Sequence, residues 1–115
     1  RQQLSWRSMV ISVLLAVAIQ ASSFDLAANE FIGCLRATVQ MGMTTRMDPE
    51  QFRASFANAC RDEESRFRTA AIRETVAQGR SEADAAAEVD TNIANGRRIF
   101  AADQESYVRS GQVPR

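Results

Sequence analysis

Several residue types that carry catalysis or nucleic-acid binding are missing from this sequence or rare in it. It has no histidine and no lysine, and only two cysteines and two prolines. Without histidine, the most common general base and a frequent zinc ligand are excluded, so the usual designs of hydrolases and metalloenzymes do not apply. The remaining residues contain no cofactor-binding motif. We therefore expect a protein that is not an enzyme and has no cofactor.

The charges are balanced. The 14 basic residues, all of them arginine, match 14 acidic residues. Proteins that bind nucleic acids usually carry a strongly basic surface, which this composition does not supply. No nucleic-acid partner is expected.

The first 23 residues are typical of a signal peptide. Basic residues open the segment, residues 9–19 form an apolar run broken only by Ser12, and small residues follow. This order predicts export, with cleavage after Ser23 or, as second choice, after Ala21. The alternative is a membrane anchor that is not cleaved, because a short apolar helix can be accommodated by a thinned bilayer.

The predicted location is therefore periplasmic or extracellular, with anchoring to the membrane if the leader is retained. A lipoprotein signal is a further alternative, because Ile32 and Gly33 precede Cys34 as at the end of a lipobox. Polar residues separate Cys34 from the apolar run, which argues against this alternative.

Residues 24–110 are predicted to form a single helical domain. Alternating β-strand patterns are absent outside the leader, and apolar residues recur at helical spacing from Phe24 onward. The breaks at Asp48-Pro49 and Gln78-Gly79 divide the chain into helices over 24–45, 49–78 and 81–110. Residues 111–115 are expected to be a frayed tail.

The third predicted helix contains a glycine at which it can break, and it has a predicted buried face. Asn95-Gly96 is a place where the helix can break, because glycine costs about 1 kcal/mol inside a helix. The face expected to pack on the other two helices consists of Val89, Ile93, Gly96, Phe100, Asp103 and Tyr107.

The two cysteines are predicted to form a disulfide. Cys34 and Cys60 lie 13 residues on either side of Met47, so a hairpin bent near Met47 brings them to the same height. Gly33 and Ala59 are small neighbours that would let the two helices approach closely. A redox-active pair is the alternative, but the spacing is not that of a Cys-x-x-Cys motif.

Three closely spaced methionines, Met41, Met43 and Met47, lie at the predicted turn. Thioethers are soft ligands, so this group is a candidate Cu(I) site that needs no histidine. The alternative is packing, because methionine fills irregular gaps where two helices meet.

Charged residues dominate the middle of the second predicted helix. Asp62 with Arg66, and Glu64 with Arg68, have the i, i+4 spacing of ion pairs on one helix. We interpret the run as a helix face exposed to solvent.

The sequence as a whole predicts an all-α fold, in which a disulfide-stapled antiparallel hairpin is completed by a third helix. The second and third helices are longer than the first, so part of their apolar surface is expected to lack a partner. The leading hypothesis is a non-enzymatic envelope protein that binds another protein or its own copy through a helix face. The alternative is a soft-metal module that uses the methionine group. Contact with a membrane is expected only through an uncleaved leader.

Overall fold

The computed structural model describes residues 22–112, and this part of the chain is all α-helical. Its four helices are α2 (Ser23–Thr44), α3 (Pro49–Phe56), α4 (Arg61–Ala77) and α5 (Glu82–Ser110). The all-α prediction is confirmed. The predicted leader lies outside the described residues except for Ser22 and Ser23, and so do residues 113–115 of the predicted tail.

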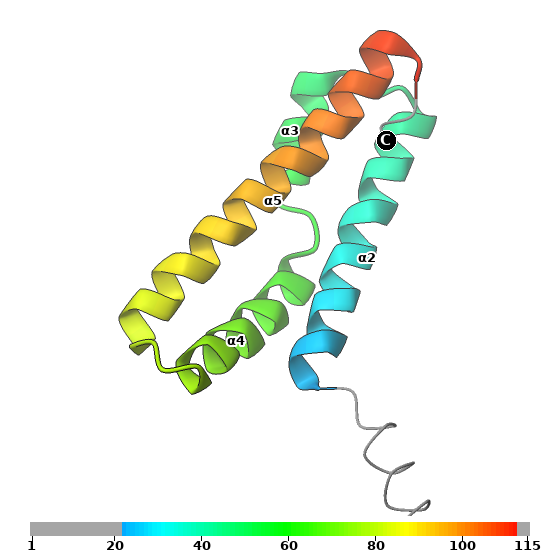
Figure 1. The fold of residues 1–115 in the computed structure, drawn as a ribbon. Coiled ribbons are helices and arrows are strands. Elements are labelled where there is room, and N and C mark those ends of the chain that lie inside the picture. The colour runs from blue at the N-terminus through cyan, green and yellow to red at the C-terminus, as the bar shows by residue number, and fades with distance from the viewer. Residues whose placement is uncertain (1–21, 113–115) are drawn as a thin grey trace, which may run out of the picture.

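The helices form an elongated bundle with α5 as its longest member (Figure 1). α2 and α5 run in the same general direction, while α3 and α4 run in the opposite direction (Figure 1). α3 packs on the later part of α5, and α4 packs on its earlier part and on α2. The two shorter helices thus follow one another along α5.

Side-chain caps fix where the helices begin. Ser22 accepts a hydrogen bond from the main-chain N–H of Asp25, and Ser81 does the same for Asp84. Asp48 accepts from two N–H groups at the start of α3, whose first residue is Pro49. These bonds satisfy amide groups that have no partner within the helix. The predicted starts near Pro49 and Ser81 are confirmed.

The core is built from large apolar side chains of α2 and α3, together with Ala101 of α5. It holds Phe31, Leu35, Val39, Met43, Phe52, Phe56 and Ala101. The Phe52 and Phe56 rings are stacked with their centroids 5.1 Å apart, and Phe31 contacts Phe67 of α4 at 5.4 Å. Burial of this cluster supplies the main driving force for packing the helices together.

The prediction of one helix over 49–78 is wrong. The chain leaves helical geometry after Phe56, and Cys60 has a left-handed backbone with φ 62° immediately before α4. Arg97 donates hydrogen bonds to the carbonyl oxygens of Phe56 and Ala59 at 2.8 and 2.7 Å. Because a side chain from α5 satisfies these carbonyls, α3 can end there and α4 can start in a new position.

The third predicted helix is present, and the break that the sequence allows at Asn95-Gly96 does not occur, since α5 runs through Gly96. Its predicted buried face is only partly right. The fully buried residues of α5 are Ala85, Val89, Ala101 and Gln104. The prediction placed Gly96 after Ile93 on this face. In the structure the residue that follows Ile93 on the face is Arg97, one position further along the helix.

The predicted role of Gly33 in close helix packing is also wrong. A Cβ atom added at Gly33 would have nothing within 4 Å. Gly42 is the glycine that permits close approach, because a Cβ there would lie 2.5 Å from Cε2 of Phe52. Gly42 therefore lets α3 pack directly on the backbone of α2.

Candidate functional site

The predicted disulfide is present. Cys34 of α2 is bonded to Cys60, and their Cα atoms lie 6.0 Å apart. Cys60 is the residue that precedes the first turn of α4, so the bond attaches α2 to the junction between α3 and α4. Closing a loop with a sequence separation of 26 residues stabilises a fold by about 3–4 kcal/mol on the chain-entropy model.

A buried polar centre lies next to this bond. The guanidinium of Arg97 is 2.7 Å from a carboxylate oxygen of Glu64, and the two side chains are only 12% and 16% exposed. The same guanidinium lies 5.6 Å from the ring centroids of both Phe31 and Phe56. Hydrogen bonds and aromatic faces thus compensate for removing the charge from water. Arg97 ties α5 to α2, α3 and α4, and this makes it a structural residue.

Gln104 is a second polar group inside the core, with 0% exposure. Its side-chain amide donates to the carbonyl oxygens of Gly42 and Met47, at 3.3 and 2.8 Å. These bonds hold the turn between α2 and α3 against α5. The Oε1 atom of Gln104 is buried and has no hydrogen-bond partner.

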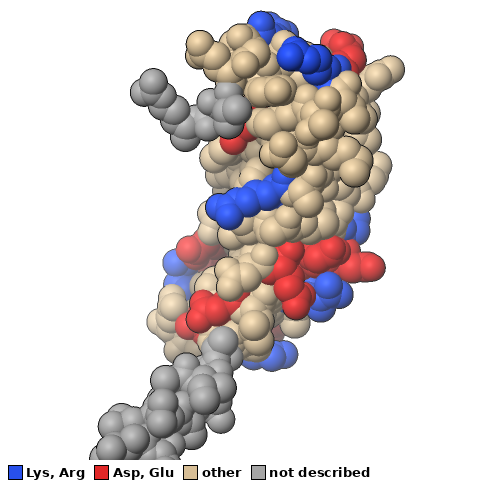
Figure 2. Space-filling model, turned by 90° about the vertical axis from the view of Figure 1, so that its right-hand side faces the viewer, with Lys and Arg blue, Asp and Glu red and all other residues tan. Residues whose placement is uncertain are grey.

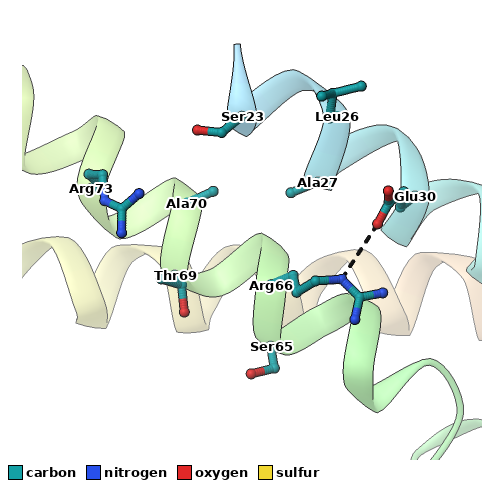
Figure 3. Close-up of a pocket in the computed structure, with 9 residues that line it drawn as sticks. All are labelled: Ser23, Leu26, Ala27, Glu30, Ser65, Arg66, Thr69, Ala70 and Arg73. Carbon is teal, nitrogen blue, oxygen red and sulfur yellow. Dashed lines mark ion pairs between the residues drawn. The ribbon is translucent and has the colours of Figure 1, made fainter. Parts of the chain in front are cut away.

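A surface groove with a volume of about 420 Å³ lies between the first turns of α2 and the middle of α4 (Figure 3). Its apolar part consists of Leu26, Ala27 and Ala70, and Leu26 is 54% exposed. Ala27 and Ala70 face the space between the two helices, while the Leu26 side chain points away from α4 (Figure 3). The small alanines leave room for a side chain of another helix, and the half-exposed leucine adds apolar surface beside them.

Two arginines of α4 border the groove. Arg66 lies 3.5 Å from Glu30 of α2, and both side chains are more than half exposed. Arg73 lines the same groove and has no ion pair with another residue of the described part. The groove therefore combines apolar residues with one arginine, Arg73, that is free to meet a carboxylate of a bound chain.

The apolar surface continues past this groove along α4. A neighbouring hollow contains Ile72 and Val76 and shares Thr69 and Arg73 with the groove. Val76 is 40% exposed. On the side of the molecule that α2 covers, the charged side chains lie mainly toward the lower half and the edges (Figure 2).

The charge run of α4 is arranged differently from the prediction. The i, i+4 pairs Asp62–Arg66 and Glu64–Arg68 do not form. Glu64 pairs with Arg61 and Arg97, while Arg68 pairs with Asp90 of α5 at 2.7 Å. The run thus bonds to other helices in addition to facing solvent.

Two of the exposed interhelical pairs shift a carboxyl pKa. The hydrogen bond from Arg68 lowers the pKa of Asp90 below its ordinary value. The hydrogen bond from Arg53 of α3 lowers the pKa of Glu105 in the same way. Both carboxylates are therefore more stable in the charged form when the helices are assembled.

The three methionines have different surroundings. Met41 is 66% exposed, Met43 is buried in the core and Met47 packs against it from the turn. A Cu(I) site that used all three would have to recruit Met43 from the core. The hypothesis stays a prediction, and packing accounts for Met43 and Met47 as the structure has them.

The groove was not anticipated from the sequence. The sequence feature that indicates the groove is Leu26, an apolar residue that does not belong to the regularly spaced apolar series of Phe24, Ala27 and Phe31. Apolar residues outside a buried series are candidates for contacts with a partner.

Comparisons with known proteins do not identify a function for this chain. No helix within residues 22–112 has the length and apolar character needed to cross a membrane. The chain matches no protein-family model, no curated protein and no solved structure.

Proposed function

We propose that this is an exported, non-enzymatic protein that binds a helix of a partner protein in the groove between α2 and α4. The observation that carries the proposal is the half-exposed Leu26 beside the small residues Ala27 and Ala70 that line the groove. Burying such a surface against an amphipathic helix would gain about 25 cal/mol for each Å² of apolar area removed from water.

The charges near the groove define the partner further. Arg73 has no ion pair within the described residues, and the long contact between Arg66 and Glu30 is exposed. A partner helix with a small apolar face and acidic residues beside it would pair with these arginines. The alternative occupant of the groove is a helix of a second copy of this chain. The mass of the protein in solution distinguishes such a dimer from a complex with another protein.

Export is supported by the disulfide between Cys34 and Cys60. Disulfides persist in oxidising compartments and are rare in the cytosol. The periplasm or the extracellular space is accordingly the proposed site of action, and the leader would anchor the protein if it were retained.

The groove is expected to be the contact site in a crosslinking experiment. A photoreactive amino acid at position 26 should give a defined adduct, whereas the same probe at position 99 should not. Ile99 is the matched control, since it is 60% exposed and lies on α5 away from the groove. Leu26→Glu should remove the interaction and Ile99→Glu should preserve it.

Light scattering completes the test. A mass that doubles in wild type and not in Leu26→Glu would identify a second copy as the occupant. A monomer whose crosslinks at positions 26 and 99 are indistinguishable would contradict the proposal.

A further inference from the structure

The surroundings of the disulfide include a carboxylate. Glu63 lies three residues after Cys60, in the first turn of α4, and this spacing places both on one side of the helix. The two sulfur atoms and a carboxylate oxygen of Glu63 all lie within 4.8 Å of one another, and all three residues are partly buried. Cys34 comes from α2, so the group joins two helices.

Glu63 has no compensating partner within the described residues. Its side chain takes part in no hydrogen bond or ion pair there, although the side chain of the neighbouring Glu64 has two arginine partners. A partly buried carboxylate is usually paired, because burial disfavours its charge. Beside an intact disulfide, Glu63 gains nothing from the sulfur atoms.

We infer that Cys34, Cys60 and Glu63 form a zinc-binding site when the disulfide is reduced. Two thiolates and one carboxylate are ligands that Zn²⁺ accepts, and its preferred fourfold coordination leaves one position for water. The N–H groups at the start of α4 add a favourable field for negatively charged sulfur. The site needs neither histidine nor the methionine group.

Zinc cannot bind while the two sulfur atoms are joined. Opening the bond requires two electrons and two protons, which a dithiol supplies as it becomes a disulfide itself. The two thiols then release their protons when Zn²⁺ binds, and the metal stays divalent throughout. The same cysteines would therefore hold α2 to α4 by a covalent bond under oxidising conditions and through a metal ion under reducing ones.

Cobalt titration of the whole chain tests this inference. The protein is reduced without oxygen by a phosphine, and Co²⁺ is then added, followed by Zn²⁺. We expect one Co²⁺ per chain, with the near-ultraviolet absorption of thiolate–cobalt bonds, and its displacement by one Zn²⁺. If the reduced chain has lost helix, zinc should restore it, which circular dichroism would show.

Variants identify the third ligand. Glu63→Gln should weaken Co²⁺ binding by roughly tenfold or more, since even residues that only orient a ligand contribute about 10–100-fold. Asp62→Asn is the matched control, because Asp62 is an exposed carboxylate of the same helix turn that lies outside the group. It should bind Co²⁺ as wild type does. Absence of thiolate–cobalt absorption, one metal shared by two chains, or equal affinity of Glu63→Gln and wild type would overturn the inference.

Discussion

The guanidinium of Arg97 lies 2.7 Å from the carboxylate of Glu64, and both side chains are largely shielded from solvent, with 12% and 16% exposed. Two further N–H groups of Arg97, on Nη1 and Nη2, donate to the last carbonyl of α3 and to the carbonyl of Ala59. One side chain of α5 thus pairs with a carboxylate at the start of α4 and donates hydrogen bonds to backbone carbonyl groups at and just after the end of α3. The division of the predicted second helix into α3 and α4 depends on this relationship.

Replacing Arg97 should therefore destabilise the fold strongly. Arg97→Met leaves Glu64 without its buried partner and the two carbonyl groups without donors. We expect the free energy of unfolding, measured by urea denaturation, to fall by about 2–4 kcal/mol. Arg98→Met is the control, since Arg98 is the exposed neighbour on α5 and its loss should cost no more than about 0.5 kcal/mol. Equal effects of the two substitutions would contradict the role given to Arg97.

The two glycines of α2 should respond in opposite directions to alanine. In Gly42→Ala the new methyl group would meet the Phe52 ring at 2.5 Å, so we expect a loss of about 1–3 kcal/mol. In Gly33→Ala the methyl group has open space, and the higher helix propensity of alanine should add up to about 1 kcal/mol. Thermal unfolding of both variants measures the difference. A stabilising Gly42→Ala would show that α3 does not pack on α2 as described.

Acid should weaken the contact between α4 and α5. The pKa of Asp90 is lowered in the folded state by Arg68, so this pair stabilises the fold above the carboxyl pKa of the unfolded chain, about 3.9. The contribution disappears as the pH falls from there through the folded-state pKa. Because the pair is exposed, the effect should be small and should shrink further with added salt.

Asp90→Asn should accordingly flatten the fall of stability below about pH 4. Asp62→Asn removes an exposed carboxylate that has no ion pair within residues 22–112 and serves as the control. Urea denaturation of each variant at several pH values gives the comparison. Parallel pH profiles for wild type and Asp90→Asn would show that the pair with Arg68 does not contribute.

The fold could be predicted where local chemistry and apolar spacing agree. Asp48 followed by Pro49 fixes the start of α3, and the apolar series of α2 faces the core as expected. The equal distance of Cys34 and Cys60 from Met47 along the sequence also predicted that the two cysteines meet. They do so although the chain between Phe56 and Arg61 is not helical throughout. The disulfide requires that both cysteines reach the same height and that their Cα atoms come close, and the left-handed Cys60 before α4 meets both conditions at 6.0 Å.

The rest depends on polar residues that are buried. Arg97 and Gln104 occupy core positions of α5, and an apolar pattern cannot assign such residues to a buried face. For this reason Gly96 and Asp103 were predicted on the buried face of α5 in place of Arg97 and Gln104. The break between α3 and α4, just before Cys60, was not predicted either. The groove beside Leu26 also depends on how α2 and α4 are placed, which local sequence does not determine.

The copper hypothesis makes a separate prediction. If Met41, Met43 and Met47 form a soft-metal site, the protein should bind Cu(I) more tightly than a variant in which all three are leucine. Competition with a chromophoric Cu(I) chelator measures both affinities, and Met41→Leu alone tests the exposed member without disturbing the core. Equal affinities of wild type and the triple variant would leave packing as the explanation for the group.

The bond between Cys34 and Cys60 is the constraint on which the arrangement of α2, α3 and α4 depends. Its most direct test is the intact mass of freshly isolated protein after alkylation, with and without prior reduction. We predict that no alkyl group is added before reduction and that two are added afterwards. Alkylation of both cysteines without a reductant would contradict the account.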